Sequence, residues 1–367
     1  MRQLVPSCAL ALARRLLMRM VHRLLRAQHS DWAHAMQAEV AAAGSEREAL
    51  SFAWGCLWAA LHHSFAGARG GLAQVHNVGV LGCVVAVLAG CAFMHSAGAP
   101  GHYVWMNLLS LAFAVATFCL IPHRRLQADE LLRARLAFAL GALLLIAGVG
   151  LAHTGASAWL RVGPVTLNLS WALLPALLVA SDVQPQSGAR SWAVGGLLMA
   201  CGALVLQADL VLLGLVAAVL AVRAWHQRDI ASVLLALAAA AMAAWVTPAW
   251  QAPQALAFVD QVIHRGFNQS ELVGLGLLLT QLMPLWLALQ HRQARQHGLV
   301  WGLLVALSLP GWLPSPLVGF TGSFIVGYVL SLMVLGNDTQ IRPPAGHRPA
   351  TAPARRTPPT WRRSRLT

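Results

Sequence analysis

The chain has 367 residues, of which 58% are hydrophobic and only 10% are charged. Soluble domains average about 25% charged residues, so this composition excludes an ordinary soluble protein and indicates a polytopic membrane protein. All 26 basic residues are arginine, and the net charge is +14. In a membrane protein such an excess marks cytoplasmic loops that face anionic lipid, an interpretation we favour over nucleic-acid binding.

The first 70 residues predict a helical prefix at the cytoplasmic surface of the membrane, outside the bundle. Arginines recur among the leucines near its start, which is typical of an amphipathic surface helix and not of a cleaved signal peptide. A second helix is predicted to begin at Ser30 or Asp31. A third is predicted to begin at Ser45, where Glu48 completes a capping box.

Apolar runs between residues 75 and 336 predict about ten transmembrane helices. The predicted spans are 77–97, 102–121, 136–152, 167–181, 191–206, 208–222, 230–246, 271–289, 297–313 and 317–335. With a cytoplasmic N-terminus, 24 of the 26 arginines fall on the cytoplasmic side, and only Arg161 and Arg265 fall outside. The positive-inside bias therefore favours an all-α polytopic membrane bundle with both termini in the cytoplasm.

The last segment, 337–367, is rich in proline, arginine and threonine and is predicted to be a disordered cytoplasmic tail. Its basic charge favours adhesion to the inner leaflet. The Ala- and Arg-rich, lysine-free composition is typical of a high-GC bacterium, so we expect the chain in a bacterial inner membrane, with membrane lipid as a partner.

This topology places several notable segments on the outer side. They are "AHTGASAWLRVGPVTLN" at 152–168, "AFVDQVIHRGFNQSEL" at 257–272, "LPGWLPSPLVGFTGSF" at 309–324, and Asp209 at the junction of two spans. The first favours an interfacial hairpin, with Trp159 at headgroup depth and a turn at Gly163 and Pro164.

Two interpretations stay open for these residues. Arg161 is either a single snorkelling charge or part of a binding site, and Asp209 either ends a loop or lies in the hydrocarbon with a function. Gly322 and Ser323 suit either close helix packing or ligand binding.

Several classes of chemistry lack any sequence signal. The six cysteines form no CxxC pair, and the histidines form no HExxH or His–carboxylate cluster. No Walker loop, dinucleotide fingerprint or GxSxG elbow is present. We therefore expect no metal, no cofactor and no ATP-driven transport.

Taken in order, the outer segments resemble the SEDS family of cell-wall polymerases, which includes FtsW, RodA and SpoVE. The resemblance covers about 75–335. It rests on Gly155, Ala156, Trp159, Leu160 and Gly163 in the second outer loop, on Gln207, Asp209 and Leu210, and on Pro314, Pro316, Gly322 and Ser323. Asp260 matches the position of the family's catalytic aspartate in the large outer loop.

The resemblance implies a ten-span fold and peptidoglycan polymerisation from lipid II, in cell division or cell-shape control. Asp260 would be the base that deprotonates the acceptor hydroxyl, and Arg161 and Arg265 would bind the diphosphate. The other substrate-binding residues implied are Trp159, Asp209, Glu271, Gly322 and Ser323. The implied partner is a penicillin-binding transpeptidase or another division or elongation membrane protein.

The chain also departs from the family pattern. The PE and HT residues that surround the catalytic aspartate in the family are missing. In the second outer loop, Ser157 and Ala158 replace the family's arginine pair, and the acidic residue that follows this pair in the family is absent. We therefore expect a divergent SEDS-like protein with a binding or scaffold role. The alternatives are an active lipid II glycosyltransferase that uses Asp260 and an unrelated small-solute transporter, for which paired intramembrane charges would be the signal.

Overall fold

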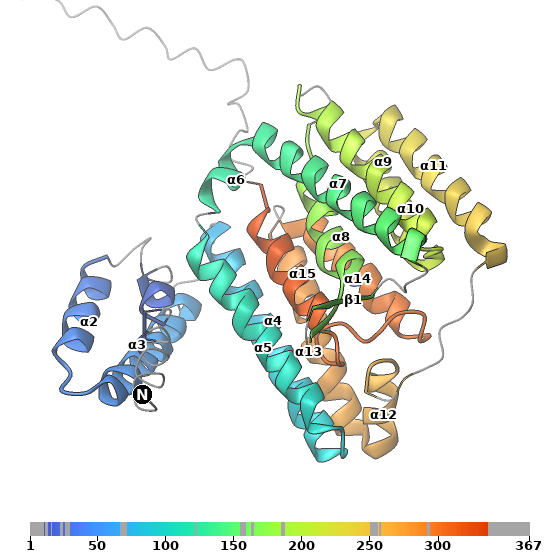
Figure 1. Cartoon of the computed structure of the whole chain (residues 1–367). Coiled ribbons are helices and arrows are strands. Elements are labelled where there is room, and N and C mark those ends of the chain that lie inside the picture. Colours follow the sequence, from blue (N-terminus) through green and yellow to red (C-terminus); the bar gives the residue numbers. More distant parts are fainter. Residues whose placement is uncertain are drawn as a thin grey trace, which may run out of the picture. The chain divides into compact units, whose positions relative to one another are not determined.

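The computed structural model describes residues 11, 14, 15, 17–22, 25, 30–66, 72–121, 123–154, 159–162, 165–184, 188–249, 256, 258–291 and 294–336. In this part of the chain the structure is all-α, apart from one two-stranded hairpin, as the sequence predicts (Figure 1). The chain divides into two compact units, Met1–Gly336 and Asn337–Thr367. The predicted tail is the second of these units, and it lies outside the described residues.

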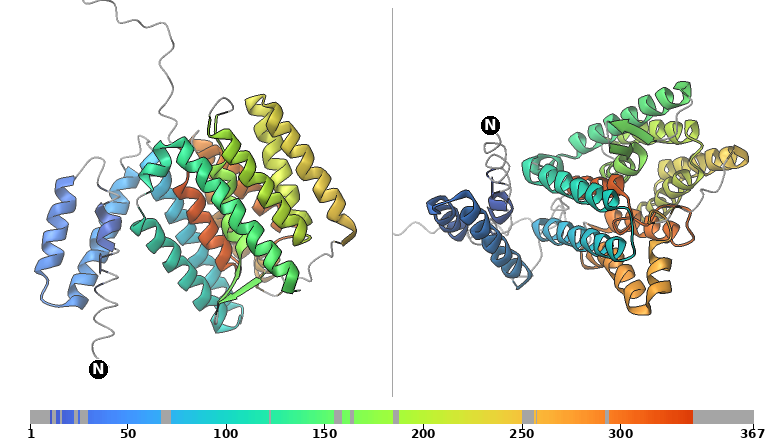
Figure 2. Two further views of the ribbon diagram at one scale, coloured as in Figure 1. Left: turned by 45° about the horizontal axis from the view of Figure 1, so that its top comes forward. Right: turned by 60° about the horizontal axis from the view of Figure 1, so that its bottom comes forward.

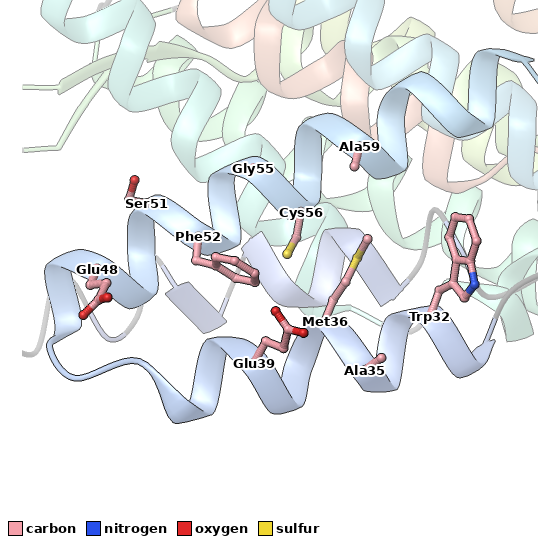
Figure 3. Close-up of a pocket in the computed structure, with 10 residues that line it drawn as sticks. All are labelled: Trp32, Ala35, Met36, Glu39, Glu48, Ser51, Phe52, Gly55, Cys56 and Ala59. Atoms are coloured by element: carbon pink, nitrogen blue, oxygen red, sulfur yellow. The ribbon is translucent and has the colours of Figure 1, made fainter.

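The helical prefix contains α2 (Ser30–Ala42) and α3 (Glu46–Ala66). The predicted capping box is present, because the Glu48 amide donates to Ser45 Oγ over 3.3 Å, and the Glu48 carboxylate accepts the Gly44 amide over 3.2 Å. A shallow hollow of about 630 Å³ lies between α2 and α3, with Trp32 and Phe52 on its walls (Figure 3).

Each of the ten predicted spans overlaps a helix in the described part of the chain. Three short helices, α6 (Arg124–Ala128), η1 (Thr247–Ala249) and α12 (Val262–Gln269), lie between the spans. The helices that overlap the spans are α4 (Leu72–Ser96), α5 (Gly101–Leu120), α7 (Glu130–Thr154), α8 (Leu169–Ala180), α9 (Arg190–Leu206), α10 (Leu210–Gln227), α11 (Ile230–Val246), α13 (Glu271–Gln290), α14 (Arg295–Ser308) and α15 (Gly322–Met333).

Four of these described helices, α4, α5, α7 and α10, are long and apolar enough to cross a membrane. Five shorter apolar helices lie in α8, α9, α11, α13 and α15. The chain is therefore a membrane protein by the length and composition of its helices. The total of ten spans and the position of the termini stay predictions.

Helix α15 forms the centre of the bundle. It packs against α4, α5, α8 and α14, and Figure 2 shows it enclosed by its neighbours. Its Phe324, Tyr328 and Leu332 side chains have no exposed surface. A second layer pairs α7 with α9 and α10 with α11, while α13 packs against α4, α12 and α14.

The loop before α8 forms the predicted hairpin. Strands β1 (Trp159–Val162) and β2 (Val165–Asn168) pair antiparallel, with Arg161 opposite Thr166. The predicted turn at residues 163 and 164 lies outside the described residues. Asn168 ends the hairpin and begins α8, because its side chain accepts the Trp171 amide over 3.2 Å.

The last two predicted spans have wrong boundaries. The span predicted at 297–313 ends as a helix at Ser308, and the one predicted at 317–335 begins only at Gly322. The 309–321 segment between them is apolar but not helical. Three prolines, at positions 310, 314 and 316, remove backbone donors and disfavour a helix.

Candidate functional site

Two irregular segments bond to each other at one end of the bundle and form what we call the two-loop platform, residues 258–262 and 311–321. The Ser315 amide donates to the Val259 carbonyl over 3.0 Å, and the Phe320 amide donates to the Phe258 carbonyl over 2.7 Å. The Val262 amide donates to Ser315 Oγ over 3.2 Å. Each segment therefore satisfies part of the other's non-helical backbone, as buried backbone requires.

Two buried amide side chains anchor the platform to the bundle. Asn107 of α5 donates to the Gly319 carbonyl over 2.7 Å and accepts the Thr321 amide over 3.2 Å. Gln281 of α13 donates to the Pro316 carbonyl over 2.5 Å. The exposed fractions of Asn107 and Gln281 are 0% and 1%, so both amides serve the platform from the bundle interior.

The platform holds several left-handed backbone conformations. Phe258, Gln261 and Leu317 have φ angles of 64°, 56° and 63°, which only glycine adopts without cost. Such conformations cost about 1–3 kcal/mol each and persist where the surroundings impose them, often beside functional sites. Their concentration around Asp260 makes the platform the strongest candidate site in the described part of the chain.

Asp260, the predicted base, is part of the loop's own structure. Its carboxylate accepts the Leu256 amide over 2.8 Å, and its own amide donates to the Leu256 carbonyl over 3.1 Å. The residue is 5% exposed. Burial raises the pKa of Asp260, and the hydrogen bond from Leu256 opposes that rise only in part.

The predicted cation nearest in sequence lies on α12. Arg265 is exposed and its guanidinium lies 5.4 Å from the centre of the Phe258 ring. Within the described residues it forms no ion pair with Asp260. Glu271 is exposed at the first turn of α13. The side chains of Trp159 and Arg161 lie outside what the structure describes, although their backbone belongs to β1.

The other predicted site residues support neighbouring backbone. Ser323 Oγ accepts the Asn168 amide over 2.9 Å. A Cβ atom on Gly322 would lie 2.4 Å from Ser110 Oγ, so α15 and α5 approach closely there. Asp209 begins α10, with its carboxylate accepting the Leu212 amide over 2.9 Å. Asp209 therefore lies at the start of a helix, and its depth relative to the membrane stays a prediction.

Hydrogen bonds link these segments into one end of the bundle, the platform end. The platform continues through Thr321 into α15, Ser323 bonds the end of β2, and Ser170 donates to Gln207 over 2.9 Å beside the α9–α10 turn. Helices α8, α10 and α15 begin here, so their C-terminal ends lie at the opposite end.

That opposite end, the arginine end, carries two ion pairs. Arg223 donates to the Ser181 and Leu178 carbonyls at the end of α8, over 3.0 and 2.8 Å, and lies 3.5 Å from Asp182. Arg190 pairs with Asp229 across the starts of α9 and α11. A guanidinium on the last carbonyls of a helix is favoured by the helix dipole.

Sequence analysis missed Asn107, Gln281 and Ser315 as parts of the site. Asn107 and Gln281 had a usable signal, since each is a lone amide inside an apolar helix. Their partners lie far along the chain, more than 30 residues away in each case, so the sequence did not predict what they contact. Among the described residues no group of three or more metal-ligating side chains is present.

Comparison of the chain with protein-family models, with curated proteins and with solved structures found no match to any of them.

Proposed function

We propose that the chain is a divergent SEDS-like protein of the bacterial inner membrane, with a binding or scaffold role and no polymerase activity. The observation that carries this proposal is the state of the Asp260 carboxylate, which is 5% exposed and accepts the Leu256 amide. A general base needs a lone pair directed at the substrate proton. Here one carboxylate oxygen accepts an amide of the loop that carries it, and the residue is almost closed to solvent.

The arrangement of the predicted segments supports the SEDS-like part of the proposal. Asp260, Ser323 and Asp209 belong to one hydrogen-bonded end of the bundle, whereas Arg190 and Arg223 lie at the other. The proposed binding site is the two-loop platform. Its occupant would be a lipid-linked glycan such as lipid II or a membrane partner such as a penicillin-binding transpeptidase.

Two observations favour an active glycosyltransferase as the second candidate. Burial raises the pKa of Asp260, and a raised carboxyl pKa is the direction that suits a general base. The left-handed residues beside it are the kind of strained backbone that active sites hold. Arg265 on the adjoining helix would then supply positive charge for the diphosphate.

Polymerisation of lipid II by the purified full chain in nanodiscs separates the two candidates. Asp260→Asn keeps an acceptor for the Leu256 amide but removes the base, so it changes chemistry more than structure. We expect no glycan chains from either the wild type or Asp260→Asn, with an active SEDS polymerase as the positive control. Glycan chains from the wild type that disappear in Asp260→Asn would reject the non-catalytic proposal and establish the second candidate.

The same loop gives a stability measurement. Asp260→Ala leaves the Leu256 amide without its acceptor, and we expect it to lower the free energy of unfolding by about 1–3 kcal/mol. Asp260→Asn should lower the free energy of unfolding by less, because its amide oxygen can still accept the Leu256 amide. Glu271→Gln removes an exposed carboxylate in the first turn of α13 and should cost less, about 0.5 kcal/mol. Equal stability of Asp260→Ala and the wild type would contradict the structural role of the carboxylate.

A further inference from the structure

A groove lies between α10 and α11 at the arginine end of the bundle. It has a volume of about 650 Å³. Its walls are Ala221, Ala224, Trp225, Arg228, Val233, Ala236 and Leu237. Apart from Arg228 these are apolar side chains, and three of them are alanines that leave room along the helix surfaces.

Arg228 is the charge that faces this groove without a carboxylate of its own. The two nearby carboxylates are already paired: Asp229 with Arg190, and Asp182 with Arg223 and with Gln227 over 3.0 Å. Within the described part of the chain Arg228 makes no ion pair and is exposed. The groove therefore ends at a guanidinium that no described carboxylate neutralises, and this guanidinium can bind an anionic ligand.

The position of Arg228 along the helix matches the depth of lipid headgroups. Helix α10 is one of the candidate membrane spans, Leu210–Gln227, and Arg228 follows its last residue directly. Trp225, one turn earlier, is 83% exposed, and tryptophan prefers the membrane–water interface. On α11, Leu234 and Leu237 are each 62% exposed, as expected for side chains that contact acyl chains.

The backbone of Arg228 also favours a use for its side chain. Its φ angle is 52°, a left-handed conformation at the end of α10 where glycine is the usual residue. An arginine there accepts a backbone cost that glycine would avoid. The cost of this left-handed backbone is explained if the Arg228 guanidinium binds a ligand at this end of the groove.

We infer that the α10–α11 groove binds an anionic phospholipid, with the lipid phosphate at Arg228 and an acyl chain along the alanine wall. A guanidinium matches a phosphate in bidentate geometry, and basic pockets between membrane helices bind anionic headgroups. The inference depends on the membrane character of the chain and not on the proposed SEDS-like function.

Thermal unfolding of the full chain in nanodiscs tests the site, with phosphatidylglycerol compared with phosphatidylcholine. A ligand that binds only the folded state raises its Tm, and we expect phosphatidylglycerol to raise the wild-type Tm by about 5 °C. Arg228→Gln removes the cation, and Ala236→Leu fills the groove but keeps the charge. Each should abolish the rise.

Two further variants separate a specific site from other effects. Arg125→Gln removes an exposed arginine on α6, away from the groove, and should keep the full response. Arg228→Gly should raise the Tm in phosphatidylcholine, since glycine relieves the left-handed backbone, and should still lose the response to phosphatidylglycerol. A response that survives Arg228→Gln, or that Arg125→Gln abolishes equally, would overturn the inference and indicate diffuse attraction to the membrane surface.

Discussion

Three aspartates at the ends of apolar runs have different structural roles, although the sequence presents them alike. Asp209 accepts a backbone amide at the start of α10, and Asp260 accepts one within its own loop. Asp229 accepts the Ala231 and Ser232 amides at the start of α11 and also pairs with Arg190. The partners of each carboxylate therefore decide how its charge affects stability.

Asp229 should make the free energy of unfolding fall as the pH becomes acidic. Burial raises its pKa, but hydrogen bonds from Arg190 and Ser232 outweigh that effect and lower the pKa from 3.8 to about 2. Its contribution, about 2 kcal/mol, is complete above the unfolded-state pKa and is lost as the pH falls through the folded-state pKa. Stability should therefore decline between about pH 4 and pH 2.

Chemical unfolding in detergent at pH 5, 3 and 2 measures this decline. Asp229→Asn should be less stable than the wild type at pH 5 and should lose less stability on acidification. Arg190→Gln should behave similarly, because it removes the partner that holds the carboxylate charged. The assignment would fail if Asp229→Asn kept the wild-type loss between pH 5 and pH 2.

At the scale of the elements, glycine sets the contact between α7 and α9. A Cβ atom on Gly141 would lie 2.2 Å from the Gly196 carbonyl oxygen, and one on Gly196 would lie 2.5 Å from the Ala137 carbonyl oxygen. Both distances are far below van der Waals contact, so the two backbones touch. Small residues at such crossings are the usual means of packing helices in membranes.

Alanine at either of these glycines should push the helices apart. We expect Gly141→Ala and Gly196→Ala each to lower the free energy of unfolding by about 1–3 kcal/mol. Gly214→Ala is the matched control, because no atom lies within 4 Å of the added Cβ and alanine favours the helix by about 0.5–1 kcal/mol. Unfolding in detergent measures all three, and a loss in Gly214→Ala as large as in the others would show that the contact is not the cause.

The sequence predicted where the helices lie far better than where they end. Apolar runs indicate the ten helices that overlap predicted spans, because burial in lipid or protein favours apolar residues along their whole length. The 309–321 segment is equally apolar, yet its prolines and its bonds to Phe258 and Val259 keep it irregular. Helix α12 was not predicted, since only Val262, Ile263 and Gly266 of its eight residues are buried.

At the scale of the whole molecule, sequence analysis identified segments of the site but not their contacts. It placed Asp260 and Ser323 on one side from the order of the spans, and both belong to the platform end. It did not predict that Asp260 bonds its own loop, because a lone aspartate between apolar runs suits a base and a loop residue equally. Contacts that join α5, α13 and the platform depend on packing between distant helices.

The orientation of the platform end remains the prediction on which the proposed function depends. We expect Ala97 and Gln269 to face the outside and Ala128 to face the cytoplasm, because the arginine count favours this arrangement. All three residues are exposed, whereas the five described cysteines are buried, so single engineered cysteines can be labelled selectively once Cys8 is replaced by serine.

A membrane-impermeant maleimide applied to intact cells should label Ala97→Cys and Gln269→Cys, and it should label Ala128→Cys only after the cells are lysed. The reverse pattern would place Asp260 in the cytoplasm, where a SEDS-like role on the outer face is impossible. Opposite results at positions 97 and 269 would show that an odd number of spans separates them, instead of the six that lie between them in the ten-span topology. In that case the helices too short to cross the membrane alone, α8 above all with its 12 residues, would be the first to reassign.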